Sequence, residues 1–334
     1  MDPGRRLMAA GAAPIQVAFV LMPDSLILDW AGPAEALRIA NQCLVQQERP
    51  PAFALRFIGP RPETTTSVGA QVHGIAALPA SWPAPTWLVL VGQPGSRIAV
   101  DTPELQDLLH WLRPLKLVER QLELVTVCAG ALLAAHAGLL SRRRATTHHH
   151  HLAELAAVAP DCEVLSNRVF VQDGPLCSSA GVTTGIDLML HRIAAVCGPA
   201  LAAQVAQSMV LALRRGPNDP ELSPFLLHRN HLHAAMHRVQ DAVSQQPERA
   251  WTLTDMAAVA CTSTRHLARL FLEHSGISPL TYLRQIRLAV AEAALRSGHN
   301  VTQAAALAGF QSDTQLRRTW HSLGLSGTPS VGRQ

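Results

Sequence analysis

The sequence is poor in aromatic residues and lacks the patterns of membrane, secreted and zinc-finger proteins. Only 4% of the 334 residues are aromatic, which leaves few side chains for an aromatic cage around a cation. Six cysteines show no Cys-x-x-Cys pair and no metal-finger spacing, so free thiols in a reducing cytosol are the simplest account. No stretch approaches eighteen uninterrupted apolar residues, and the apolar run 15–22 is short and followed by Pro23-Asp24. We therefore expect a cytoplasmic protein without a membrane span, and we interpret 15–22 as a strand.

The length and the hydrophobic content indicate two domains. At roughly 150 residues per domain, 334 residues correspond to two, and 48% hydrophobic residues are ample for two cores. The segment 214–230 is rich in proline and turn-forming residues, which is typical of a linker. We thus predict a flexible tail at 1–12, a first domain at 13–213, this linker, and a second domain at 231–334.

The positive charge of the chain is concentrated in its last third. Residues 1–230 contain 18 basic and 18 acidic residues, whereas 231–334 contain ten arginines, no lysine and six acidic residues. The whole net charge of +4 therefore lies in the second domain. Because attraction to phosphate is additive and independent of sequence, this excess favours a nucleic-acid partner.

Two helix-turn-helix patterns follow one another in the second domain. The spacing of apolar residues predicts a helix at 252–259, a short break at 260–262, and a basic helix from Thr264. The arrangement returns with a helix at 301–307, a turn at 309–311 and a second basic helix at 313–321. Such basic helices can lie in a DNA major groove. The DNA-binding residues that we predict are Ser263, Thr264, Arg265, His266, Arg269, Ser312, Thr314, Gln315, Arg317 and Arg318.

These residues also carry a resemblance to the AraC/XylS transcriptional regulators over about 231–325. It rests on Leu267-Ala268-Arg269-Leu270-Phe271, Gly276-Ile277-Ser278-Pro279, Tyr282-Leu283, Arg287-Leu288, Ala291, Leu295 and Gly309-Phe310. The resemblance implies recognition helices at 264–274 and 313–322, held by a linker helix at 279–297. The second unit departs from the family pattern, since Ala304-Ala305 and Leu316 replace larger residues. We expect Arg265 and its neighbours to read bases more strongly than Arg317 and Arg318.

The first domain alternates short apolar strands with helices. Strands are predicted at 15–22, 53–58, 87–91 and 122–127, and a hairpin at 169–177 that turns at Asp173-Gly174. Helices are predicted at 34–43, 103–118, 129–137, 149–158, 184–196 and 200–213. This order is that of an α/β sandwich, followed by an all-α domain with two helix-turn-helix units.

One spot in the first domain suggests chemistry. In Val127-Cys128-Ala129-Gly130-Ala131 a strand runs directly into a helix, a sharp turn that can present a nucleophile and lower the pKa of a thiol. Together with 28–35, 137–140, 145–148 and 178–188, it resembles the PfpI-like branch of the class I glutamine amidotransferase-like fold, which is flavodoxin-like, over about 14–213. The resemblance places Cys128 at the elbow and Glu35 as the carboxylate that faces it.

Catalysis is not expected, because active hydrolases of that branch carry histidine directly after the elbow cysteine, and this chain has Ala129. We interpret Cys128 first as a pocket wall, second as a redox-sensitive thiol and only third as a nucleophile. Consecutive residues of an α-helix point about 100° apart, so in the run 148–151 only a pair such as His148 and His151 is expected to converge. We therefore predict no metal site and no cofactor. A ligand pocket is expected around Asp29, Glu35, Cys128, His148, Ala180 and Gly181.

The two resemblances together imply a ligand-responsive transcription regulator. The expected protein is an activator that binds double-stranded DNA, acts with RNA polymerase, forms a homodimer and responds to a small nitrogenous metabolite. Two alternatives stay open: a cysteine-dependent hydrolase or amidase fused to a DNA-binding module, and a constitutive architectural protein whose first domain only dimerises.

Overall fold

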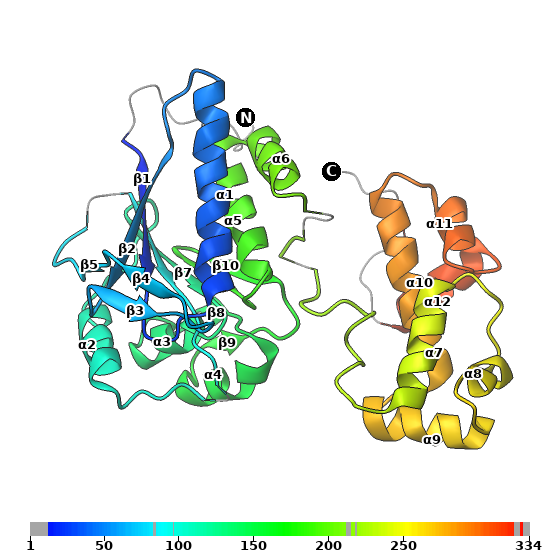
Figure 1. Cartoon of the computed structure of the whole chain (residues 1–334). Coiled ribbons are helices and arrows are strands. Elements are labelled where there is room, and N and C mark those ends of the chain that lie inside the picture. The colour runs from blue at the N-terminus through cyan, green and yellow to red at the C-terminus, as the bar shows by residue number, and fades with distance from the viewer. Residues whose placement is uncertain are drawn as a thin grey trace. The chain divides into compact units, whose positions relative to one another are not determined.

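The computed structural model describes residues 13–82, 85–95, 97–211, 215–217, 219–323 and 328–329. Contacts divide the chain into two units, Met1–Glu221 and Leu222–Gln334, and we describe each by itself (Figure 1). The predicted tail at 1–12 lies outside the described residues, as do 212–214 and 218 of the predicted linker.

A seven-stranded sheet forms the middle layer of the first unit. Its strand order is β10-β11-β7-β6-β1-β2-β5, and all neighbours are parallel except the hairpin pair β10 and β11. The strands are β1 (Ile15–Val20), β2 (Phe53–Gly59), β5 (Ala76–Ala77), β6 (Thr86–Leu90), β7 (Leu122–Val127), β10 (Phe170–Asp173) and β11 (Leu176–Ser179). Two small two-stranded sheets pair β3 (Glu63–Thr65) with β4 (Gln71–His73) and β8 (Arg144–Ala145) with β9 (Glu163–Val164).

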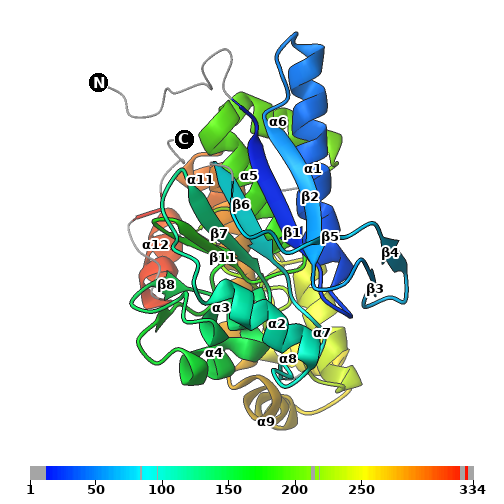
Figure 2. The same ribbon diagram turned by 90° about the vertical axis from the view of Figure 1, so that its left-hand side faces the viewer.

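Helices cover both faces of this sheet. One face carries α1 (Ile27–Gln46), α5 (Thr184–Cys197) and α6 (Pro199–Ser208), which pack against one another. The other face carries α2 (Pro103–Leu112), α3 (Gly130–His136) and α4 (Leu152–Val158), which lie in front of the strands in Figure 2. The central strands are buried on both sides, with Val17, Ala18 and Phe19 fully covered. The predicted α/β sandwich, the four strands and the hairpin are confirmed.

Several predicted helix boundaries of the first unit are wrong. Helix α1 begins at Ile27, seven residues before the predicted start, because tertiary hydrogen bonds to Asp29 hold its first turn in place. Helix α2 ends at Leu112 rather than at 118, and α6 ends at Ser208 rather than at 213. The run His149–His151 forms a 3₁₀ turn that precedes α4, so it is not the first turn of an α-helix.

The second unit is helical. It contains α7 (Ala234–Gln245), α8 (Leu253–Val259), α9 (Thr264–Ser275), α10 (Pro279–Arg296), α11 (Val301–Leu307) and α12 (Asp313–Ser322). Helices α8 and α11 begin with capping boxes, Thr252 with Asp255 and Asn300 with Gln303. The prediction missed α7, whose Met236, Val239 and Val243 have helical spacing and are buried.

The long helix α10 joins two small hydrophobic cores. Its first half places Tyr282, Leu283 and Ile286 in a core shared with α7, α8 and α9. Its second half places Leu288 and Leu295 in a core shared with α11 and α12. That second core is rich in alanine, as the sequence indicated, and so buries less apolar area per residue.

The ends of the predicted linker are tied to the two units. Arg215 forms an ion pair of 2.7 Å with Asp187, and the backbone oxygen of Asp219 accepts a hydrogen bond from Val169. Further along, Phe225 packs against the first helical core and the backbone oxygen of His228 accepts a 2.7 Å hydrogen bond from Gln240. Polar and turn-forming residues thus make specific contacts here that the composition did not predict.

Candidate functional site

The elbow predicted from the sequence is present. Cys128 follows β7 directly and has a φ of +57°, in the left-handed region that side chains other than glycine rarely adopt. Its backbone nitrogen donates to the oxygen of Ser179, and its own oxygen accepts a 2.8 Å hydrogen bond from the Thr147 hydroxyl. These bonds hold the strained turn between β7 and α3.

Glycines allow three backbone segments to close over this turn. A Cβ at Gly181 would lie 2.3 Å from the Cβ of Cys128, and a Cβ at Gly130 would lie 2.2 Å from the backbone oxygen of Leu90. A Cβ at Gly92 would approach both Asp29 and Cys128. Such distances exclude any larger residue without rearrangement, so these glycines fix the close approach. As a result the Cys128 residue is only 4% exposed.

The carboxylate that faces the thiol belongs to Asp29. Its two oxygens accept hydrogen bonds from the backbone nitrogens of Val182, at 2.8 Å, and Gly92, at 3.1 Å. Burial raises the pKa of Asp29, although these N–H groups and the Cys128 thiol act in the opposite direction. Burial and then the charge of Asp29 raise the pKa of the Cys128 thiol far above its usual range.

A protonated thiol that donates to a buried carboxylate is a poor nucleophile. The backbone N–H of Ala129 at the start of α3 acts to lower the pKa of this thiol, as the elbow geometry suggested, but burial and the charge of Asp29 outweigh it. In this arrangement the thiol contributes to the hydrogen bonding of Asp29 and fills the space under Gly181.

The structure does not bring all predicted pocket residues together. Asp29, Cys128 and Gly181 meet at the elbow, and Ala180 beside them is buried and donates its N–H to the oxygen of Val169. Glu35, predicted to face the thiol, lies instead on the exposed side of α1, where it pairs with Arg38. The prediction for Glu35 is wrong because Asp29, in the first turn of α1, is the inward-facing carboxylate, and six further residues of helix turn Glu35 about 120° away from it.

His148 stands just beyond Thr147, whose hydroxyl contacts the elbow backbone. It is half-buried, and burial followed by the neighbouring histidines lowers its pKa to about 4. In this turn the possible metal-ligating atoms of His148, His149 and His150 all lie within 4.8 Å of one another. The expectation that only a pair such as His148 and His151 converges is wrong, because the segment is not α-helical.

A cavity of about 250 Å³ lies at the carboxyl ends of β1 and β6, near the elbow in the fold, and we call it the edge cavity. It is lined by Met22, Pro23, Asp24, Gln93, Pro94, Arg97, Ile98, Ala99, Thr102 and Glu104. None of these residues was predicted, although their position after two parallel strands was a usable signal.

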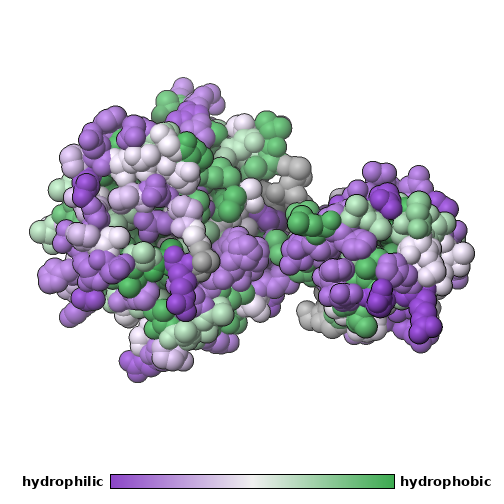
Figure 3. Space-filling model, turned by 60° about the horizontal axis from the view of Figure 1, so that its bottom comes forward, coloured by the Kyte–Doolittle hydropathy of each residue, from purple (hydrophilic) through white to green (hydrophobic). Residues whose placement is uncertain are grey.

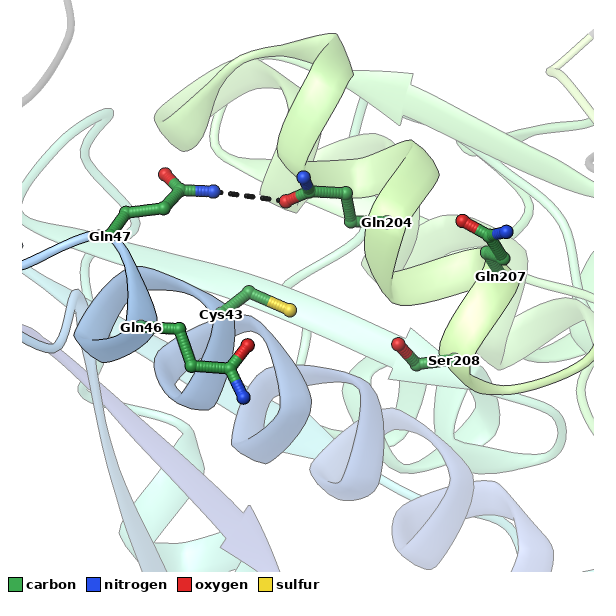
Figure 4. Close-up of a pocket in the computed structure, with 6 residues that line it drawn as sticks. All are labelled: Cys43, Gln46, Gln47, Gln204, Gln207 and Ser208. Atoms are coloured by element: carbon green, nitrogen blue, oxygen red, sulfur yellow. Dashed lines mark hydrogen bonds between the residues drawn. The ribbon is translucent and has the colours of Figure 1, made fainter.

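A second cavity of about 320 Å³ lies between α1 and α6 (Figure 4). Cys43 and Gln46 come from the end of α1, Gln207 and Ser208 from α6, and a hydrogen bond joins Gln47 to Gln204. Because α1 ends before β2 begins, this cavity is at the amino ends of the strands. Ligands of open α/β sheets bind at the opposite edge, so the edge cavity is the better ligand site.

In the second unit, α9 has the features of a recognition helix. The Ser263 hydroxyl caps it by accepting from the backbone nitrogen of His266. Arg265 and Arg269 are exposed, Thr264 and His266 are partly exposed, and Arg269 donates to the His266 ring at 3.0 Å. The opposite side of the helix is buried in the first core through Leu267, Leu270 and Phe271.

Helix α12 repeats this design with a smaller buried side. The Ser312 hydroxyl caps it, and Leu316 anchors it in the second core. Thr314, Gln315, Arg317 and Arg318 are exposed. The turn before it depends on Gly309, where a Cβ would lie 2.5 Å from the Cα of Glu248. Both predicted sets of DNA-binding side chains are therefore available at helix surfaces.

The visible surface of each unit carries both hydrophobic and hydrophilic residues. Figure 3 shows hydrophobic side chains in separate patches among hydrophilic ones. No helix in the described part of the chain is long and apolar enough to cross a membrane.

Comparison with known families assigns both units. Residues 84–195 match the DJ-1/PfpI family, and residues 256–323 match a helix-turn-helix domain family. The HTH-type transcriptional regulator CdhR of Pseudomonas aeruginosa is 29% identical over 316 residues, 94% of this chain and 90% of that protein. The HTH-type transcriptional regulator GlxA of Rhizobium meliloti is 28% identical over 321 residues, 96% of this chain and 95% of that protein.

A solved structure supports the fold of the first unit. A ThiJ/PfpI family protein from Pseudomonas syringae superposes with a TM-score of 0.52 and 18% identity, covering 74% of this chain and 91% of that one. The chain therefore combines a DJ-1/PfpI domain with an AraC-type helix-turn-helix domain, the arrangement of the HTH-type transcriptional regulators to which it is similar. Both resemblances inferred from the sequence are confirmed.

Proposed function

We propose that the protein is a sequence-specific transcription activator whose DJ-1/PfpI domain binds a small nitrogenous metabolite without transforming it. The observation that carries the proposal is the pair of capped, basic helices α9 and α12, joined by α10 and accompanied by the net positive charge of the second unit. Two such helices about one DNA turn apart, roughly 34 Å, would read adjacent major grooves.

The first unit supports a sensing role rather than a catalytic one. The pKa of the elbow thiol is raised, the residue after it is Ala129, and Gly181 covers it. The runner-up function, a cysteine hydrolase fused to a DNA-binding module, needs an accessible thiolate that this arrangement opposes. An amidase assay with the wild-type protein and the Cys128→Ser variant tests it directly.

The edge cavity is our proposed effector site. Arg97 supplies a cation and Asp24 a carboxylate, a combination that complements a zwitterion such as an amino acid, whereas the lining carboxylate of Glu104 is paired with Arg61. At about 250 Å³ the cavity suits a ligand smaller than a drug molecule. In this proposal Asp29 holds the backbone of Gly92, the residue before Gln93 of the cavity lining, through its 3.1 Å hydrogen bond.

Genome-wide mapping of bound sites is the first test, because the neighbouring genes would identify the pathway. Wild-type protein is compared with the Arg265→Ala, Arg269→Ala double variant, and loss of discrete peaks in the variant is expected. A thermal-shift screen of amino acids and small amines follows. A ligand at 100 times its dissociation constant should stabilise the first unit by about 2.7 kcal/mol. Arg97→Ala should abolish that stabilisation, and Arg113→Ala, an exposed arginine outside the cavity, should retain it.

Homodimerisation and contact with RNA polymerase are part of the same proposal. Both are inferred from the resemblance to transcription regulators, in which a dimer binds two half-sites on the DNA. Sedimentation of the intact chain at micromolar concentration tests the dimer, and transcription from a mapped promoter with purified polymerase tests activation.

A further inference from the structure

Three histidine side chains lie close together in the turn that connects β8 to α4. The ring centroids of His148 and His149 are 4.1 Å apart, those of His149 and His150 are 4.3 Å apart, and those of His148 and His150 are 4.9 Å apart. The 3₁₀ conformation of His149–His151 after an extended His148 produces this convergence. Without a shared ligand, three imidazoles so close together gain little and repel one another when protonated.

A buried carboxylate orients one of these rings. Glu221 is 9% exposed, and its Oε1 atom lies 2.7 Å from Nδ1 of His149. The same oxygen accepts the backbone N–H of His149 at 3.1 Å. With Nδ1 committed as donor to the carboxylate, the lone pair of the His149 ring lies on Nε2. A carboxylate behind a histidine in this way is a common feature of metal sites, where it fixes the tautomer and strengthens the ligand.

The rings of His148 and His150 also have a nitrogen available to bind a metal ion. Nδ1 of His148 faces the backbone N–H of His150 at 3.4 Å, which leaves Nε2 of His148 outward. His150 is exposed, so its ring can rotate without disturbing the core. His151 has a different role, because it is buried and its Nδ1 lies 3.0 Å from Glu154, which also accepts the backbone N–H of Ile98.

We propose that His148, His149 and His150 form a binding site for a divalent transition metal, with Glu221 positioning His149. Three imidazoles without a thiolate suit zinc, copper or nickel rather than magnesium or calcium. In such a site each metal–nitrogen bond is roughly 2.0–2.1 Å long, so the three ring nitrogens must lie closer together than the 4.8 Å observed. Rotation of the exposed His150 ring can bring its nitrogen closer to the other two. Three protein ligands leave a fourth coordination position open.

The site also lies next to the exit from the first unit. Glu221 is the last residue of that unit, and the chain continues from it into the DNA-binding unit. Metal binding at His149 would therefore stabilise the segment 219–221 in the conformation observed here. This consequence does not depend on the identity of the small-molecule effector.

Zinc binding to the full-length protein, free of any affinity tag, tests the proposal. Competition with a chromophoric chelator measures the stoichiometry and the dissociation constant. We expect one zinc ion per chain, and visible d–d absorption of a four-coordinate site when cobalt is substituted. His150→Ala should weaken binding at least tenfold, and Glu221→Gln should weaken it about 10- to 100-fold. His110→Ala, which removes an exposed histidine from α2, is the matched control and should bind as the wild type does.

Three results would refute the site. The first is that the wild type binds no stoichiometric zinc, and the second is that the His150→Ala and His110→Ala variants bind zinc equally well. Equally tight zinc binding by the urea-unfolded chain would also refute it. The last outcome would indicate the general affinity of a histidine-rich segment. Because His150 is exposed, its variant is expected to keep the wild-type melting temperature without metal, which separates lost ligation from lost folding.

Discussion

The contact between Gly181 and the elbow gives a stability prediction that can be worked out from the structure. Gly181 has a φ of +91°, and an added Cβ would lie 2.3 Å from Cβ and 2.8 Å from Sγ of Cys128. The left-handed backbone costs a residue with a side chain about 1–2 kcal/mol. Overpacking a fixed core position adds about 1–3 kcal/mol. Gly181→Ala should therefore destabilise the first unit by about 2–5 kcal/mol.

Gly138→Ala is the matched control. Gly138, also in the first unit, has a φ of +77°, but nothing lies within 4 Å of its added Cβ, so only the backbone cost of about 1–2 kcal/mol applies. For a domain of this size each kcal/mol lowers the melting temperature by about 2–4 °C. Differential scanning calorimetry should place Gly181→Ala about 2–12 °C below Gly138→Ala. The further substitution Cys128→Gly should recover part of that difference, since it removes the Cβ and Sγ atoms that clash. Equal melting temperatures for the two alanine variants would contradict the close approach at the elbow.

Three further outcomes are expected. Iodoacetamide at pH 7.5 should modify exposed Cys261 long before Cys128, and comparable rates, read by mass spectrometry, would refute the buried thiol. Because the pKa of the Cys128 thiol is raised, its rate should still rise above about pH 9.5, where a thiol with the ordinary pKa of about 8.5 has levelled off. Cys128→Ser should leave operator binding without effector within twofold of wild type in an anisotropy titration, whereas a large loss would show that the elbow controls the DNA-binding unit. A fragment that starts at Leu222 should melt at a higher temperature than one that starts at His231, because the shorter fragment loses the packing of Phe225 and the hydrogen bond to the His228 oxygen.

Much of the fold could be predicted from periodicity. A continuous apolar run such as Trp87–Leu90 corresponds to a strand buried on both faces, and the N-cap serines Ser263 and Ser312 mark the starts of the two basic helices. These are local signals, so a single sequence is sufficient to detect them. Helix α7 carries the same kind of signal in Met236, Val239 and Val243, although it was not predicted.

The candidate site was harder to predict, because it depends on contacts between distant segments. Asp29, rather than Glu35, faces Cys128, since backbone N–H groups of Gly92 and Val182 hold the first turn of α1 inward. No local pattern shows those bonds. The convergence of the histidines depends on a 3₁₀ turn, which the sequence does not distinguish from the start of an α-helix. Glu221, which supports that turn, is 72 residues from His149.

The central claim is that the second unit reads DNA through α9, supported by a weaker contribution from α12. Fluorescence anisotropy of a mapped operator with the full-length protein measures this most directly. Arg265→Ala and Arg269→Ala should each raise the dissociation constant about 5- to 150-fold, as expected for loss of about 1–3 kcal/mol, and Arg317→Ala should raise it less. Arg113→Ala, which removes one positive charge from the surface of the first unit, should leave it within twofold. Wild-type affinity in both α9 variants, or a larger loss in Arg317→Ala, would contradict the assignment.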